Sequence, residues 1–152
     1  MDMTPAELEK RLAAALERRG LASAAEVAWA TAWLEGCGYP GLKMLDEALS
    51  DPVRERDLQR DVVGLDLAGV SCVFLAPAIM RQVASERRVF LRNVRHGLFL
   101  LPFTVRENVA IGCPVDPAFA VGGERTKNPY AEKLAAAETS GISVDDRLLA
   151  SI

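Results

Sequence analysis

The sequence predicts a mixed α/β fold of the α+β kind, in which an N-terminal helical hairpin is followed by mixed strands and helices. Two capping-box patterns within the first forty residues each precede apolar residues at helical spacing. Short runs rich in valine and leucine between residues 62 and 94 have the composition of strands. Half of the 152 residues are hydrophobic and 26% are charged, which is ordinary for a globular domain.

The helical hairpin is predicted from the first forty residues. Thr4 to Glu7 forms a capping box with a proline at the first helical position, and leucines follow at helical spacing. Ser23 to Glu26 forms a second capping box, and the helix after it has an apolar face wide enough to pack on more than one side. The second helix is expected to end in a glycine-rich corner at residues 36–41, G-C-G-Y-P-G.

The remaining elements are expected from composition and spacing. Residues 70–83 are strongly apolar and fit either a strand followed by a helix or one buried helix. The other expected elements are a helix at 42–49, a solvated turn or helix face at 51–61, strands at 62–67 and 89–94, a helix within 98–109 with Pro102 near its start, a loop at 112–129, a helix capped by Asn128 and Pro129 that runs to Glu138, and a short strand at 142–144.

The chain length is that of one domain, predicted to cover residues 1–152. Within it, residues 1–50 form a helical N-terminal part, and residues 62–111 form a strand-helix-strand-helix core. Residues 112–152 supply a loop and a C-terminal part.

Charge and cysteine content narrow the classes of partner. The net charge of −3 and the pI of about 5.3 argue against nucleic acid as a partner, since phosphate binding needs a concentrated basic surface. Cys37, Cys72 and Cys113 form no C-x-x-C pair, and the chain has one histidine, so no metal site is expected. Three free thiols, together with no signal peptide and no membrane-spanning segment, predict a cytoplasmic protein.

Three segments contain candidate site residues. Arg92, Asn93, Arg95 and His96 can bind an anionic substrate, or they can be a turn with solvated arginines. The glycine corner can bring backbone amides close to a phosphate, or it can be a helix end. A polar loop carries Gly122, Gly123 and Asn128 and is the third candidate. The acidic pairs Asp145–Asp146 and Asp61/Asp66 are expected to be surface charge.

The order of these segments resembles the N-terminal half of the type-2 malate/L-lactate dehydrogenase family. The corner Gly36–Gly41 looks like the family's G-H-x-S-H-G, and Arg92–Gly97 looks like its R-N-S-N-H-F. Pro117–Ala131 looks like its loop with G-G and N-P, and Ile142–Asp145 looks like the strand that follows.

The resemblance implies a non-Rossmann scaffold, a homodimer, and hydride transfer between NAD(P) and a 2-hydroxy or 2-keto acid. The family's catalytic histidine falls on Pro40, with Tyr39 at the preceding serine, and the second half of the family fold has no counterpart here. The chain therefore looks like a truncated, degenerate bacterial relative. Tyr39 or His96 would have to replace the missing proton donor.

Three functions follow as hypotheses. The first is a non-catalytic relative that binds a small anionic metabolite or a protein partner. Its ligand residues would be Arg92, Asn93, Arg95, His96, Gly122, Gly123 and Asn128. The second is an NAD(P)-dependent oxidoreductase acting on a 2-hydroxy or 2-keto acid. The third is a structural or assembly protein that acts through a dimer interface.

Overall fold

The computed structural model describes residues 1–62, 64–86, 88–113, 119–121 and 130–152, and the fold is mixed α/β. The contacts group the chain into two compact units. Unit 1 comprises Met1–Ser50 and Asn128–Ile152, and unit 2 comprises Asp51–Lys127. The sequence predicts one domain over residues 1–152, and the end of its predicted helical part coincides with the boundary after Ser50. Each unit is described by itself.

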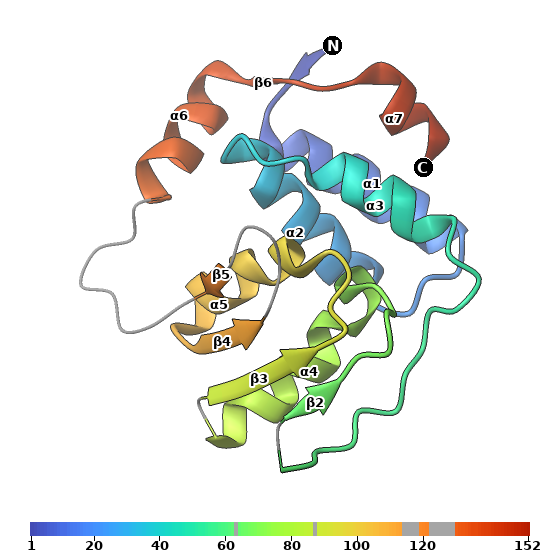
Figure 1. The fold of residues 1–152 in the computed structure, drawn as a ribbon. Helices are drawn as coiled ribbons and strands as arrows, with labels where there is room; N and C mark the ends of the chain where they lie inside the picture. Colours follow the sequence, from blue (N-terminus) through green and yellow to red (C-terminus); the bar gives the residue numbers. More distant parts are fainter. Residues whose placement is uncertain (63, 87, 114–118, 122–129) are drawn as a thin grey trace. The chain divides into compact units, whose positions relative to one another are not determined.

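Unit 1 consists mainly of helices, and its two short strands come from opposite ends of the chain (Figure 1). Its helices are α1 Pro5–Arg18, α2 Ala24–Gly36, α3 Gly41–Leu49, α6 Ala131–Ser140 and α7 Asp146–Ser151. Strand β1, Asp2–Met3, pairs antiparallel with β6, Ile142–Ser143. The strand expected at 142–144 is therefore confirmed, whereas β1 and α7 were not predicted.

The two predicted capping boxes have different outcomes. The Thr4 hydroxyl accepts a hydrogen bond from the Glu7 backbone N–H at 3.2 Å, so the predicted start of α1 is confirmed. The prediction for Ser23 is wrong, because its side chain makes no capping hydrogen bond. The Ser23 backbone has ψ 36°, outside the extended conformation that places a capping hydroxyl over the helix amides.

Helix α2 is the centre of unit 1. It contacts α1, α3 and α6, which explains why apolar residues surround it on more than one side. Its fully buried side chains include Val27, Ala30 and Leu34. The wide apolar face predicted from the sequence is confirmed.

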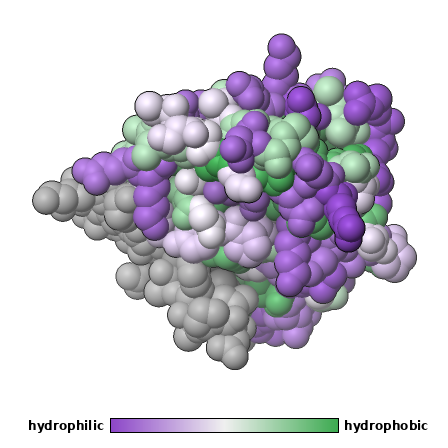
Figure 2. Space-filling model, turned by 90° about the horizontal axis from the view of Figure 1, so that it is seen from above, coloured by the Kyte–Doolittle hydropathy of each residue, from purple (hydrophilic) through white to green (hydrophobic). Residues whose placement is uncertain are grey.

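The face of the molecule in Figure 2 carries hydrophilic side chains over much of its area, with smaller hydrophobic patches between them.

Unit 2 contains a four-stranded sheet in the order β2-β3-β4-β5 (Figure 1). The first three strands are parallel, and β5 is antiparallel to β4. Parallel neighbours need a crossover connection. Helix α4 joins β2 to β3, and the 3₁₀ helix η1 with α5 joins β3 to β4. The elements are β2 Leu65–Asp66, α4 Cys72–Glu86, β3 Arg88–Arg92, η1 Gly97–Leu100, α5 Leu101–Glu107, β4 Ala110–Cys113 and β5 Phe119–Val121.

The structure of unit 2 decides between the two alternatives for residues 70–83, and it contradicts the loop predicted at 112–129. Most of the apolar segment 70–83 lies in a single helix, α4, which begins at Cys72 and contains Pro77. The prediction of an uninterrupted loop over 112–129 is wrong, because Phe119–Val121 forms strand β5. Prolines and glycines around this run indicated a loop. The edge of β4 offers backbone hydrogen bonds that a short apolar run can satisfy, and local composition does not reveal such a partner.

Candidate functional site

The segments that follow β2 and β3 lie at the same edge of the parallel sheet. An isolated parallel bridge between Ser71 and Arg95 extends this neighbourhood beyond the strands. Three of the four non-glycine residues with positive φ in the described part of the chain occur here, namely Ala68, Asn93 and His96. Left-handed backbone is costly for residues with a Cβ and is often found at ligand sites. This edge is therefore the candidate functional site.

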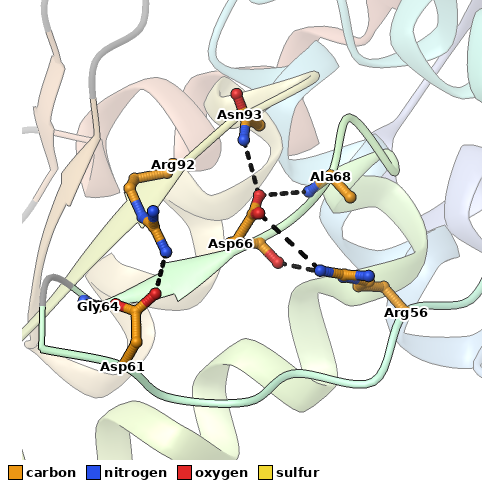
Figure 3. A network of polar contacts seen from close by, with 7 residues as sticks. All are labelled: Arg56, Asp61, Gly64, Asp66, Ala68, Arg92 and Asn93. Carbon is orange, nitrogen blue, oxygen red and sulfur yellow. Dashed lines mark hydrogen bonds and ion pairs between the residues drawn. The ribbon is translucent and has the colours of Figure 1, made fainter.

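Asp66 connects the two segments (Figure 3). Its carboxylate accepts hydrogen bonds from the Asn93 side-chain amide at 2.7 Å and from the Ala68 backbone N–H at 2.9 Å. Arg56 donates from Nε to the Asp66 carbonyl oxygen at 3.3 Å, and its guanidinium lies 3.9 Å from the carboxylate. The hydrogen bond from Asn93, followed by that from Ala68, lowers the pKa of Asp66 from its ordinary value.

Arg92 points to a different carboxylate in the same network (Figure 3). Its guanidinium forms an ion pair with Asp61, whose carboxylate also accepts the Gly64 backbone N–H at 3.0 Å. Gly64 has φ 143°, and a Cβ there would lie 2.0 Å from the Phe90 carbonyl oxygen. Only glycine fits this turn, so the Asp61 loop is held close against β3.

Arg95 and His96 each have an internal partner as well. Arg95 donates from two nitrogens to the two oxygens of Asp51, at 2.9 and 3.0 Å. His96 Nδ1 lies 2.7 Å from the Ser71 hydroxyl oxygen, which also accepts the Val73 backbone N–H at 3.1 Å. Ser71 is fully buried and precedes the first residue of α4. It acts as the N-cap of α4 and as an anchor for the imidazole.

A pocket of about 570 Å³ opens beside this edge, entirely within unit 2. The turn formed by Ala68, Gly69 and Val70 contributes to its lining, together with residues 51–53 and 55–56. Arg56 and Arg95 contribute positive charge, with side chains 42% and 41% exposed. Asp51 and Glu55 contribute negative charge to the same lining. The pocket thus presents both signs of charge.

The residues predicted for the site are only partly brought together. Four of them lie at the sheet edge that follows β2 and β3, namely Arg92, Asn93, Arg95 and His96. Each forms a hydrogen bond or ion pair with a serine or aspartate of unit 2. Gly122, Gly123 and Asn128 lie outside the described residues. The candidate proton donor Tyr39 belongs to unit 1, where its ring lies 6.4 Å from that of Tyr130.

Several partners and residues of this edge were missed from the sequence. Asp61 and Asp66 lie at the surface as expected, but their contacts with Arg92 and Asn93 were not predicted. Ser71 was not considered, although a serine directly before an apolar run is a standard signal for the start of a helix. Ala68 gave no signal, because nothing in its side chain indicates a left-handed backbone.

The glycine corner of unit 1 is the helix end that the more conservative interpretation predicted. Cys37 is the C-cap of α2, and Gly38 follows with φ 84°. The Cys37 thiol is buried, and this desolvation raises its pKa to about 11, so the thiolate is scarce at neutral pH. The corner therefore joins α2 to α3 and presents no activated nucleophile at Cys37.

Two general features of the described residues complete the site. No group of three or more histidine, cysteine, aspartate or glutamate side chains among them is arranged to hold a metal ion. None of the helices in that part of the chain combines the length and apolar character that a bilayer span requires.

Comparison with known proteins gives no relative: no family model, no curated protein and no solved structure matches the chain.

Proposed function

We propose that this chain binds a small polar metabolite with an anionic group in the pocket of unit 2, and that it does so without catalysing its conversion. The observation that carries the proposal is the placement of Arg56 and Arg95 in the lining of one pocket, beside the left-handed turn at Ala68. Both guanidinium groups are held by groups of the same unit and remain partly exposed.

The held guanidinium groups favour recognition of a carboxylate. An arginine has five N–H donors in a fixed plane. The bonds to Asp51 engage Nε and one terminal nitrogen of Arg95, and a terminal N–H group remains for a ligand. Because Asp51 already fixes the Arg95 side chain, binding costs less conformational entropy than it would for a mobile arginine.

The carboxylates of the lining narrow the class of ligand further. Asp51 and Glu55 would repel a ligand that carries only negative charge. They can instead accept a hydrogen bond from a hydroxyl group next to the ligand carboxylate. A 2-hydroxy acid has both groups on adjacent carbons. This is also the substrate class that the dehydrogenase resemblance implies, although that relationship stays a prediction.

We propose binding without catalysis because the residues at two candidate catalytic positions, Pro40 and His96, are poorly suited to that role. Pro40 stands where the resembled family has its catalytic histidine, and proline has no proton to donate. His96 is absent from the described pocket lining, and its Nδ1 is bonded to the N-cap of α4.

Thermal melting of the purified protein tests the proposal. A ligand at a hundredfold excess over its Kd adds about 2.7 kcal/mol to the free energy of unfolding. We expect malate or another 2-hydroxy acid to raise Tm, and we expect Arg56→Ala to remove that shift. Arg81→Ala changes an exposed arginine on α4 outside the pocket and should keep it.

Other outcomes count against the proposal. No shift with any hydroxy or keto acid would overturn it and favour the assembly function. A shift with NADH or NADPH, together with turnover of the acid, would replace it with the oxidoreductase function.

A further inference from the structure

A second pocket, of about 250 Å³, lies entirely within unit 1 between α1, α2 and α6. Both tryptophans of the chain, Trp29 and Trp33, line it from α2. They are four residues apart, so their side chains lie on the same face of the helix. This pocket shares no lining residue with the pocket of unit 2 that contains Arg56 and Arg95, and its chemical character is different.

The aromatic wall is held in place by packing. Trp33 is only 8% exposed, and its ring lies 5.1 Å from that of Tyr130 at an interplanar angle of 54°. Tilted aromatic pairs at this distance are favourable. Pro5 and Leu134 add apolar surface around the indoles. The Trp33 ring is therefore already fixed before a ligand binds and does not have to be ordered on binding.

Two carboxylates, those of Glu9 and Glu138, belong to the same lining. The Glu138 carboxylate accepts the Ala6 backbone N–H at 2.9 Å, which fixes it at the first turn of α1. Among the described residues that line the pocket none is basic, and within that part of the chain neither carboxylate forms an ion pair. The pocket thus combines indole rings with two carboxylates and, in its described lining, no basic side chain.

This combination selects a particular kind of ligand. The faces of indole rings attract cations, and quaternary ammonium groups are recognised in this way in other proteins. Carboxylates add Coulomb attraction and would repel an anion. A bare metal ion is a poorer fit, because hard cations need six or more oxygen ligands or water, whereas most of this wall is apolar.

We propose that the pocket of unit 1 binds a small organic ammonium ion, with the charged head against Trp29 and Trp33 and within reach of Glu9 and Glu138. The volume accommodates a methylated ammonium head with a short chain. The proposal concerns unit 1 alone, so it stands or fails independently of ligand binding in unit 2.

Intrinsic tryptophan fluorescence tests the proposal directly, because both tryptophans of the chain line this pocket. The probe is choline, titrated at constant ionic strength. Its matched control is 3,3-dimethylbutan-1-ol, which has the same shape without the charge. We expect a saturable fluorescence change with choline and at least tenfold weaker binding of the alcohol.

Charge-neutral variants of Glu9 and Glu138 test whether their carboxylates contribute to choline binding. Glu138→Gln keeps an oxygen that accepts the Ala6 N–H, so the fold of α1 should be preserved. Combined with Glu9→Gln, it should weaken choline binding at least tenfold, which corresponds to about 1.4 kcal/mol. Glu132→Gln on α6 removes the same charge outside the pocket and should leave affinity within a factor of two or so.

Three results would overturn the proposal. The first is equal binding of choline and its neutral isostere, which would make the pocket a purely apolar site. The second is choline binding that the double glutamine variant does not weaken, while circular dichroism shows an intact fold. The third is the absence of any saturable fluorescence change with choline.

Discussion

The Glu35 carboxylate accepts a hydrogen bond from the Gly41 backbone N–H at 2.8 Å, so a side chain from the last turn of α2 caps the first turn of α3. The Leu42 N–H lies 3.5 Å from the same oxygen. Desolvation raises the pKa of Glu35 above its ordinary value of 4.5, against the lowering effect of these two amides. Asp145 raises it further.

The raised pKa of Glu35 predicts the direction of a pH effect. The folded state holds this proton to higher pH than the unfolded state does. The stabilising contribution is therefore complete below pH 4.5 and is lost as pH rises through the folded pKa. Glu35→Gln keeps an acceptor for the Gly41 N–H without the charge. We expect its Tm to fall less than that of the wild type between pH 4 and pH 7.

The control for this effect is Glu17→Gln, which removes an exposed carboxylate from α1. Its Tm should follow the wild-type pH profile. A wild-type slope retained in Glu35→Gln would contradict the assignment. Glu35→Ala removes the acceptor altogether and should cost about 1 kcal/mol in urea unfolding at neutral pH, as the loss of a helix cap does.

Gly41→Ala is predicted to destabilise the same corner for a steric reason. A Cβ at Gly41 would lie 2.6 Å from the Thr31 carbonyl oxygen and 3.0 Å from Leu34 Cβ, so α2 and α3 would have to move apart. Overpacking of this kind costs about 1–3 kcal/mol. Gly38→Ala is the matched control: its Cβ meets nothing within 4 Å, and only its φ of 84° opposes the change.

Urea unfolding of both variants separates the steric cost at Gly41 from the backbone strain at Gly38. Gly38→Ala should lose about 1 kcal/mol through backbone strain alone. Gly41→Ala should lose more than that. If Gly41→Ala were as stable as the wild type, the close approach of the two helices would be disproved.

Sequence signals that depend on neighbouring residues identified the starts of two helices. The Thr4 cap of α1 and the position of Pro102 in the first turn of α5 are both confirmed. The Ser23 cap failed where the Ser23 backbone departs from the extended conformation, a torsion that composition does not determine.

Long-range relationships could not be derived from the sequence. Strand β1 exists because Met3 pairs with Ile142, and strand β5 exists because Val121 pairs with Ile111. At the candidate site, the cluster from Arg92 to His96 was found, but its partners were not. Asp51 lies 44 residues from the arginine that it binds, and such a pairing leaves no periodic signal.

Asp66 predicts a pH effect opposite to that of Glu35. Because its pKa is lowered, chiefly by the Asn93 hydrogen bond, its stabilising contribution is present above its ordinary value of 3.8 and is lost as pH falls through the folded pKa. Asp66→Asn should therefore flatten the acid side of the profile of Tm against pH. Asp57→Asn, in an exposed part of the same unit, should leave the acid side unchanged. A full acid slope in Asp66→Asn would rule out this assignment.

Ala68→Gly is predicted to stabilise unit 2. Ala68 has φ 52°, which costs about 1–2 kcal/mol for a residue with a Cβ, and glycine would relieve that strain. The greater entropy of glycine in the unfolded chain offsets about 0.5–1 kcal/mol of this gain. The net effect is a gain of up to about 1.5 kcal/mol. Ala84→Gly, in an exposed position of α4, should instead lose about 0.5–1 kcal/mol. A loss of stability in Ala68→Gly would mean that the turn is not left-handed.

Ser71 and His96 allow the cap of α4 to be separated from the anchor of the imidazole. Ser71→Ala removes the acceptor for the Val73 N–H as well as the contact with His96 Nδ1, and should cost about 1–2 kcal/mol in urea unfolding. His96→Asn removes the imidazole contact but keeps a residue that tolerates the left-handed backbone at φ 58°. It should therefore cost less than Ser71→Ala, because the capping hydrogen bond remains. If both variants lost the same stability, the contact between Ser71 and His96 would be the dominant interaction, and the imidazole would be a structural element of this edge with little freedom to serve a ligand.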